Sequence, residues 1–141
     1  MGRLPLALGI AITASGLAAQ GPTLPPILRR GLDAYSAHGP DSAVTTWLKG
    51  SPAVTDVGAV SSTVAALERI QQAYGKMIGS DALSRVPLGA HVARYYVVLL
   101  FEHGPVFSWF DVYDSPAGSV VTGFLFNTKP DQIFPPTFFA H

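Results

Sequence analysis

The stretch from His91 to Asn127 constrains the fold more than any other part of the chain. It holds most of the aromatic residues, spaced among valines, and short segments containing Gly or Pro interrupt it and precede it. Aromatic and β-branched residues favour strands, and Gly and Pro permit the tight reversals between them. Connections this short join only antiparallel neighbours. The pattern predicts an antiparallel sheet with strands over 82–87, 92–102, 106–114 and 119–127.

The two central strands give this sheet one apolar face and one divided face. The reversal at His103 and Gly104 is expected to pair Phe101 with Val106. The apolar face then carries Tyr95, Val97, Leu99, Phe101, Val106, Ser108, Phe110 and Val112. The divided face carries Arg94, Tyr96, Val98, Leu100, Glu102, Phe107, Trp109, Asp111 and Tyr113. Because both faces are largely apolar, we expect helices to cover one and another subunit to cover the second.

Two features of the sheet stay open at this point. The pattern does not say which face the helices cover. A change of one residue in the 115–118 turn would move Phe124 and Phe126 from one face to the other, so the register of the last strand is not fixed.

About three amphipathic helices are expected ahead of the sheet. The first begins near Pro26, which suits a first helical turn, and its apolar stripe consists of Ile27, Leu28, Gly31, Leu32 and Tyr35. The second opens at Asp41, a good N-cap, and ends at Gly50. Trp47 on this helix is interpreted as a core residue, and Arg29 and Arg30 as a solvated helix face without a function.

The third helix has the clearest periodicity. Residues 51–58 are interpreted as a linker, and Ser61, Ser62 or Thr63 is expected to cap a helix that runs through Ile78. Its apolar residues recur at spacings of three and four: Val64, Leu67, Ile70, Tyr74 and Met77. The chain thus predicts helices followed by a sheet.

The first twenty residues are interpreted as a targeting sequence rather than as part of the folded domain. Arg3 precedes an apolar run from Leu4 to Ile12, and small residues follow as far as Ala19 and Gln20. This is the pattern of a secretory signal peptide, and the run is shorter than the ~20 residues that a membrane-spanning helix needs. We expect a signal peptide over 1–20, a single mature domain over 21–141, no stable membrane anchor after cleavage, and a secreted or periplasmic bacterial protein.

Charge and cysteine content exclude several functions. The formal net charge is zero, which offers no basic surface for nucleic acid. The chain has no cysteine, so disulfides, thiolate metal sites and cysteine nucleophiles are absent. His38, His91, His103 and His141 are scattered over expected turns and the C-terminus without metal-ligand spacing. No metal site and no cofactor are expected, and 127–131 is interpreted as a polar exit turn.

Helices followed by a curved antiparallel sheet with this ending resemble the NTF2-like superfamily, and more narrowly its small secreted bacterial members of unassigned function. The positions that carry the resemblance are Gly104, Pro105, Phe107, Phe110, Tyr113, Pro116, Phe124, Phe126 and Asn127. It spans residues 28–134. The resemblance implies an α+β cone with three N-terminal helices packed on a four-stranded sheet. Such cones serve as ligand pockets, as dehydratase or isomerase sites and as dimerisation modules, so the fold alone does not choose a function.

The divided face holds the candidate site residues: Arg94, Tyr96, Trp109, Asp111 and Tyr113. Asp111 is the one candidate for a catalytic residue, because an acidic group in the middle of an aromatic strand can serve as a general base when its pKa is raised. The alternative, which we favour, is that Asp111 pairs with Arg94, accepts from the Tyr96 hydroxyl or faces water.

Two hypotheses of different class follow, beside a third interpretation as a structural or envelope-associated partner protein, which predicts no cavity. The first is a non-enzymatic module that forms a homodimer through the sheet face or holds a small apolar ligand in the cone. The second is a small isomerase or dehydratase, in which Asp111 is the general base and Tyr96 or Tyr113 donates to an oxyanion. The second requires an enclosed cavity around Asp111.

Overall fold

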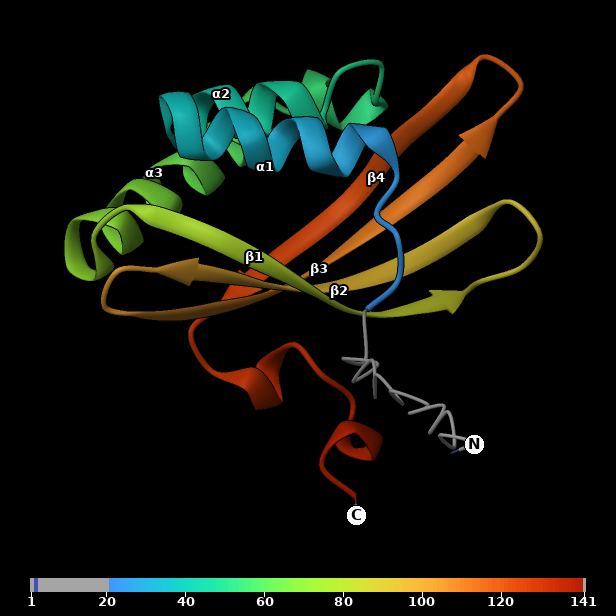
Figure 1. Ribbon diagram of the computed structural model, residues 1–141. Coiled ribbons are helices and arrows are strands. Elements are labelled where there is room, and N and C mark those ends of the chain that lie inside the picture. The colour runs from blue at the N-terminus through green and yellow to red at the C-terminus, as the bar shows by residue number, and fades with distance from the viewer. Residues whose placement is uncertain (1, 3–20, 141) are drawn as a thin grey trace.

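The structure is a computed structural model that describes Gly2 and residues 21–140. Apart from Gly2, the predicted signal peptide lies outside the described residues, and so does His141. Three α-helices precede a sheet of four strands in the described part of the chain (Figure 1). The α+β class, the three helices and the curved four-stranded antiparallel sheet of the sequence prediction are confirmed.

The sheet is a meander in which neighbours in sequence are neighbours in space. Its strands are β1 (Met77–Pro87), β2 (Val92–Phe101), β3 (Gly104–Ser115) and β4 (Gly118–Asn127), in the order β1-β2-β3-β4 with every pair antiparallel. The turn glycines Gly89 and Gly118 have positive φ values of 96° and 126°, a conformation that side chains other than glycine rarely allow.

Helices α1 (Pro26–His38) and α2 (Pro40–Trp47) follow one another with a single residue between them. The five residues of the predicted α1 stripe are all buried, which confirms that stripe. Gly39, at φ 93°, ends α1 and also precedes the first residue of α2. Asp41 was therefore wrong as the N-cap of α2; it lies in the first turn, where a negative charge still favours the helix.

Helix α3 (Val57–Tyr74) starts earlier and ends earlier than the sequence predicted. Its N-cap is Asp56, whose carboxylate accepts from the Ala59 N–H at 3.0 Å, so Ser61, Ser62 and Thr63 lie inside the helix. The predicted linker over 51–58 instead contains a short 3-10 helix, Pro52–Thr55, and the beginning of α3. At the other end Gly75, at φ 85°, stops the helix, and β1 begins two residues later.

The helices cover the apolar face of the sheet (Figure 1). The predicted pairing of Phe101 with Val106 was wrong by two residues, because Phe101 pairs with Gly104 and Val106 with Leu99. A shift of two leaves every side chain on its predicted face. On β4, Phe124 pairs with Phe110 and Phe126 with Ser108, which puts both phenylalanines on the helix side and fixes the register that the sequence left open.

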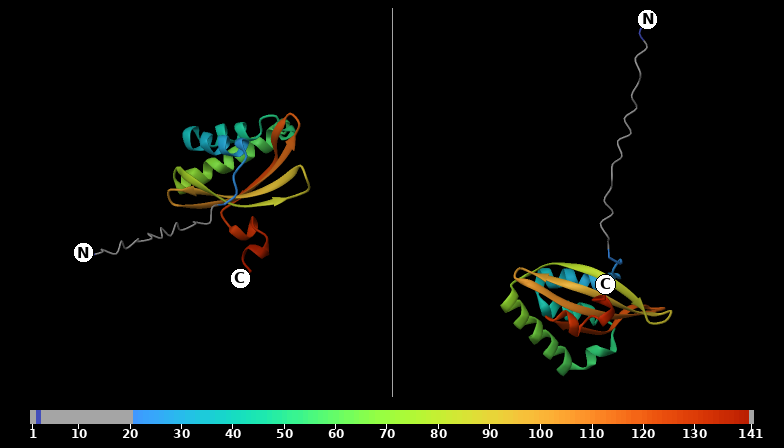
Figure 2. Two further views of the ribbon diagram at one scale, coloured as in Figure 1. Left: turned by 45° about the vertical axis from the view of Figure 1, so that its right-hand side comes forward. Right: turned by 90° about the horizontal axis from the view of Figure 1, so that it is seen from below.

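The other face of the sheet is partly covered by the chain's own C-terminal segment, residues 128–140. This segment contains two 3-10 turns, η2 (Pro130–Gln132) and η3 (Pro136–Phe138), and it lies on the side opposite the helices (Figures 1 and 2). Ile133 and Phe134 are buried there against Tyr96 and Val98. Residues 127–131 therefore lead into a packed segment rather than simply leaving the sheet.

None of the helices formed by residues 21–140 has the length and the apolar character that crossing a membrane requires.

Candidate functional site

The C-terminal segment separates the predicted site residues into two groups. The Tyr96 ring lies 5.5 Å from that of Phe134 and 5.0 Å from that of Phe138, measured between centroids, and Tyr96 is buried. Phe107 is covered in the same way by Phe134. Tyr96 therefore belongs to a small second core. Trp109 is partly buried at the edge of this core, and Arg94, Asp111 and Tyr113 lie beyond it on the uncovered part of the face.

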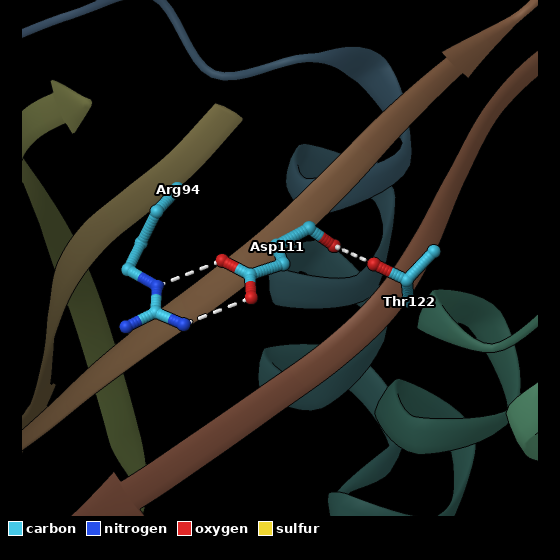
Figure 3. Close-up of polar contacts among 3 residues, drawn as sticks. All are labelled: Arg94, Asp111 and Thr122. Atoms are coloured by element: carbon cyan, nitrogen blue, oxygen red, sulfur yellow. Dashed lines mark hydrogen bonds and ion pairs between the residues drawn. The ribbon is translucent and has the colours of Figure 1, made fainter. Parts of the chain in front are cut away.

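Arg94 contacts both Asp111 and Trp109 on this part of the sheet. It lies on β2 directly opposite Asp111 on β3, and its Nε and one terminal nitrogen donate to the two carboxylate oxygens at 2.8 and 2.9 Å (Figure 3). The guanidinium carbon lies 3.8 Å from the centre of the Trp109 ring, a distance typical of stacked cation–π contacts. The side-chain hydrogen bond to Asp111 raises the pKa of Arg94 further above its already high value, so the side chain remains a cation.

Asp111 has little freedom to act as a base. Both oxygens of its carboxylate already accept from one guanidinium, in the paired arrangement that the sequence analysis favoured. A substrate proton could reach this carboxylate only if one of its two contacts with the guanidinium were broken. The backbone oxygen of Asp111 accepts from the Thr122 hydroxyl at 3.4 Å, beside a β-bulge between β3 and β4 (Figure 3). The strand that carries the ion pair is thereby tied to its neighbour.

Apolar side chains surround the ion pair and remain partly open to solvent. Val86 pairs with Arg94 from β1, Tyr113 follows on β3, and Leu125 pairs with Trp109 from β4. These three are 38% to 44% exposed. We call this surface the open face; it consists of Val86, Arg94, Trp109, Asp111, Tyr113 and Leu125.

The space between the helices and the sheet is filled by aromatic side chains. Trp47 is fully buried, and its ring contacts those of Phe110, Phe126 and Phe124 at centroid distances of 4.9, 5.8 and 6.0 Å. Its indole N–H donates to the Leu28 carbonyl at 3.2 Å, so the ring has a fixed orientation. The interpretation of Trp47 as a core residue is confirmed.

The cavities of the described chain lie around this filled centre. Two of them, of about 240 and 170 Å³, lie between α3 and β4 and share Thr63 and Phe124 as lining residues. A larger one, of about 650 Å³, lies where α1, α2 and the start of β4 meet, and a fourth lies beside His38 and Gln72. Asp111 lines none of these four cavities.

The part of the chain that the structure describes contains no cluster of potential metal ligands. No three His, Asp or Glu side chains gather there as ligands for a metal ion. His38 is the last residue of α1, a correction to its placement in a turn, whereas His91 and His103 lie in the β1–β2 and β2–β3 turns.

Sequence reasoning missed the C-terminal segment as part of the site. Its signal was two pairs of apolar residues, separated by Pro135, Pro136 and Thr137 and without strand or helix periodicity: Ile133, Phe134, Phe138 and Phe139. Such a run has no regular structure to indicate which surface it covers. It determines which of the candidate residues stay accessible.

No family model, curated protein or solved structure matches the chain.

Proposed function

We propose that this protein is a secreted or periplasmic binding module with an NTF2-like cone, non-enzymatic, which forms a homodimer through the open face. The observation that carries the proposal is an Arg–Trp–Asp cluster bordered by exposed apolar side chains on a rigid sheet. Aromatic residues and arginine are the types most enriched at the centres of protein interfaces.

The choice of a second copy rests on charge. The open face carries one cation, Arg94, and one anion, Asp111, and the whole chain has a formal net charge of zero. Two such faces related by a two-fold axis meet without net repulsion, and each guanidinium can lie over the partner's carboxylate. The two groups already satisfy each other, which lowers the cost of removing them from water.

The filled space between helices and sheet favours this function over a ligand held inside the cone. Trp47 and the three phenylalanines fill the centre of this space, and the two cavities that remain between α3 and β4, of about 240 and 170 Å³, are each smaller than the roughly 300 Å³ at which small-molecule sites typically begin. The ion pair at Asp111 likewise gives no support to an isomerase or dehydratase, because a general base must be free to accept a proton.

Light scattering combined with size-exclusion chromatography tests the proposal. We expect the purified protein to be a dimer at micromolar concentration and Leu125→Glu to be a monomer, because the new carboxylate would lie in the contact. Leu125 is 44% exposed, so the variant should keep the thermal stability of an isolated protomer.

Val57→Glu is the matched control. Val57 is 71% exposed at the start of α3, away from the open face. Its replacement by glutamate should therefore leave the dimer intact. A wild-type protein that is monomeric at these concentrations, or a Leu125→Glu variant that remains dimeric, would contradict the proposed interface.

A further inference from the structure

We infer that the 650 Å³ cavity between α1, α2 and β4 binds a small amphipathic organic anion, with its charged head group on Arg30 and Lys49 and its apolar body on Ile27 and Leu48. This site is separate from the open face and independent of dimerisation. Its volume is in the range of about 300 to 1,000 Å³ that is typical of small-molecule sites.

The lining residues divide into a polar rim and an apolar floor. Ile27 and Leu48 are buried, whereas Arg30, Thr45 and Lys49 are exposed at the edge. The remaining lining residues are Thr46, Gly50, Val54 and Ser119. A ligand with one charged end and one apolar end matches this division, because each end then meets its own kind of surface.

The charge of the rim is positive. No carboxylate lines the cavity, and neither Arg30 nor Lys49 forms an ion pair within residues 21–140. Two carboxylates lie close to the rim without lining the cavity: Asp33 follows Arg30 by three residues on α1, and Asp114 accepts from the Ser119 hydroxyl at 2.6 Å, so that hydroxyl is already engaged as a donor. The Thr46 hydroxyl donates to the Ser42 carbonyl. The donors left for an anion are therefore Arg30, Lys49 and the Thr45 hydroxyl.

Helix dipoles do not cancel this charge. The first turn of α1 and the last turn of α2 both lie at the cavity, at the end of the molecule from which the β3–β4 hairpin extends (Figure 1). A helix N-terminus carries about +0.5 of an elementary charge and a C-terminus about −0.5, so the two ends oppose each other. The full charges of Arg30 and Lys49 remain, and α1 has no side-chain cap that would compete for its N-terminus.

An NMR titration of the ¹⁵N-labelled protein with octanoate, and with 1-octanol as the neutral analogue, tests the site. Octanoate should shift the amide signals of Thr45, Gly50 and Ser119, and 1-octanol should bind about tenfold more weakly or not at all, because it lacks the charge-assisted contacts. Equal binding of the two probes, no binding of octanoate, or shifts confined to Phe124 and Phe126 beside α3 would overturn the inference.

Charge-removing variants provide the matched comparison. Arg30→Gln with Lys49→Gln should weaken octanoate binding by about tenfold or more. Arg29→Gln removes a neighbouring exposed cation of the same helix that does not line the cavity, and should leave binding unchanged. An equal loss in the Arg29 variant would indicate attraction by overall charge and overturn the site. The thermal midpoint of each variant shows that the fold is retained, and a monomeric protein would leave this test intact.

Discussion

Gly31 shows how one residue determines the packing of two helices. It lies on the buried stripe of α1, where the indole of Trp47 rests against it, and a β-carbon at this position would overlap the indole ring. We expect Gly31→Ala to lower the free energy of unfolding by about 1–3 kcal/mol, because the ring must move away from Phe110 and from its hydrogen bond to Leu28. Urea unfolding followed by circular dichroism measures this.

Gly58→Ala is the control for the Gly31 substitution. Gly58 lies in the first turn of α3, and its nearest neighbour to an added β-carbon is the Asp56 carboxylate at 3.8 Å. This variant should be more stable than wild type by about 0.5–1 kcal/mol, since alanine favours helix. If Gly31→Ala also stabilised the protein, the close contact with Trp47 would be refuted.

Tyr35 should make the stability of the fold depend on pH in alkaline solution. Burial, with a smaller effect of the Glu68 charge, raises the pKa of its hydroxyl well above the ordinary value of 10.0. The unfolded chain then loses this proton from about pH 10 upward while the folded chain still holds it. The contribution of Tyr35 to the free energy of unfolding should therefore be fully present below pH 10. As the pH rises further, this contribution should be lost, and the free energy of unfolding should fall by up to about 1.4 kcal/mol per pH unit.

Urea unfolding between pH 8 and pH 11 checks the contribution of Tyr35. Tyr35→Phe should reduce the alkaline loss of stability, whereas Tyr113→Phe, which changes an exposed tyrosine of the open face, should not. If the free energy of unfolding fell with pH as steeply in Tyr35→Phe as in the wild type, other groups would be responsible for the alkaline loss of stability.

Single residues of the candidate site were predicted unevenly from the sequence. Strand alternation put Arg94 and Asp111 on one face, and their opposite charges then made pairing the simplest outcome. Their placement directly across from each other was not predicted, because the β2–β3 turn is two residues tighter than expected. Tyr96 was predicted on the same face but lies under Phe134, which no local pattern could indicate.

The C-terminal segment behaves as an element although it has no regular structure of its own. Phe134 is only 7% exposed and contacts Tyr96, Phe107 and Phe138, whereas Phe139 in the same segment is 51% exposed. We expect Phe134→Ala to lower the free energy of unfolding by about 3 kcal/mol, the usual effect of truncating a buried phenylalanine. Phe139→Ala should lower it by less than about 1 kcal/mol. Chemical unfolding of the two variants compares them directly.

Equal costs for the two substitutions would argue against a packed C-terminal segment. An increase in the binding of an apolar dye by Phe134→Ala, without loss of the circular dichroism of the sheet, would show that the segment detaches as a unit and exposes the second core.

The boundary between α3 and β1 shows where periodicity misleads. Met77 continues the spacing of Leu67, Ile70 and Tyr74, so the pattern predicts a helix through Ile78. The glycine at position 75 adopts a positive φ that ends the helix, and Met77 is buried instead as the first residue of β1. An apolar residue satisfies both patterns, so only the glycine distinguished them.

At the scale of the whole molecule, the class and the order of elements were predictable because each β-turn carries its own Gly or Pro and each helix its own apolar stripe. The coverage of the second face was not, since it depends on contacts between segments far apart in the chain, such as Phe134 with Phe107. The cavity at Arg30 and Lys49 escaped prediction for the same reason: Arg30 lies on α1 and Lys49 lies in the turn after α2.

The outer edge of β1 is shaped in a way that limits how copies of this protein can assemble. The register of β1 against β2 shifts at Ile78 and at Leu83, and such irregularities bend a strand. The backbone at Gly21 also lies so close to the Ala82 carbonyl of β1 that a β-carbon would overlap it. Irregular or covered edges do not accept an added strand. Pairing of a further strand is thereby hindered at this part of β1, which leaves β4 as the more regular edge for contact between folded copies. Folded copies joined through β4 alone would form pairs and not a continuous sheet.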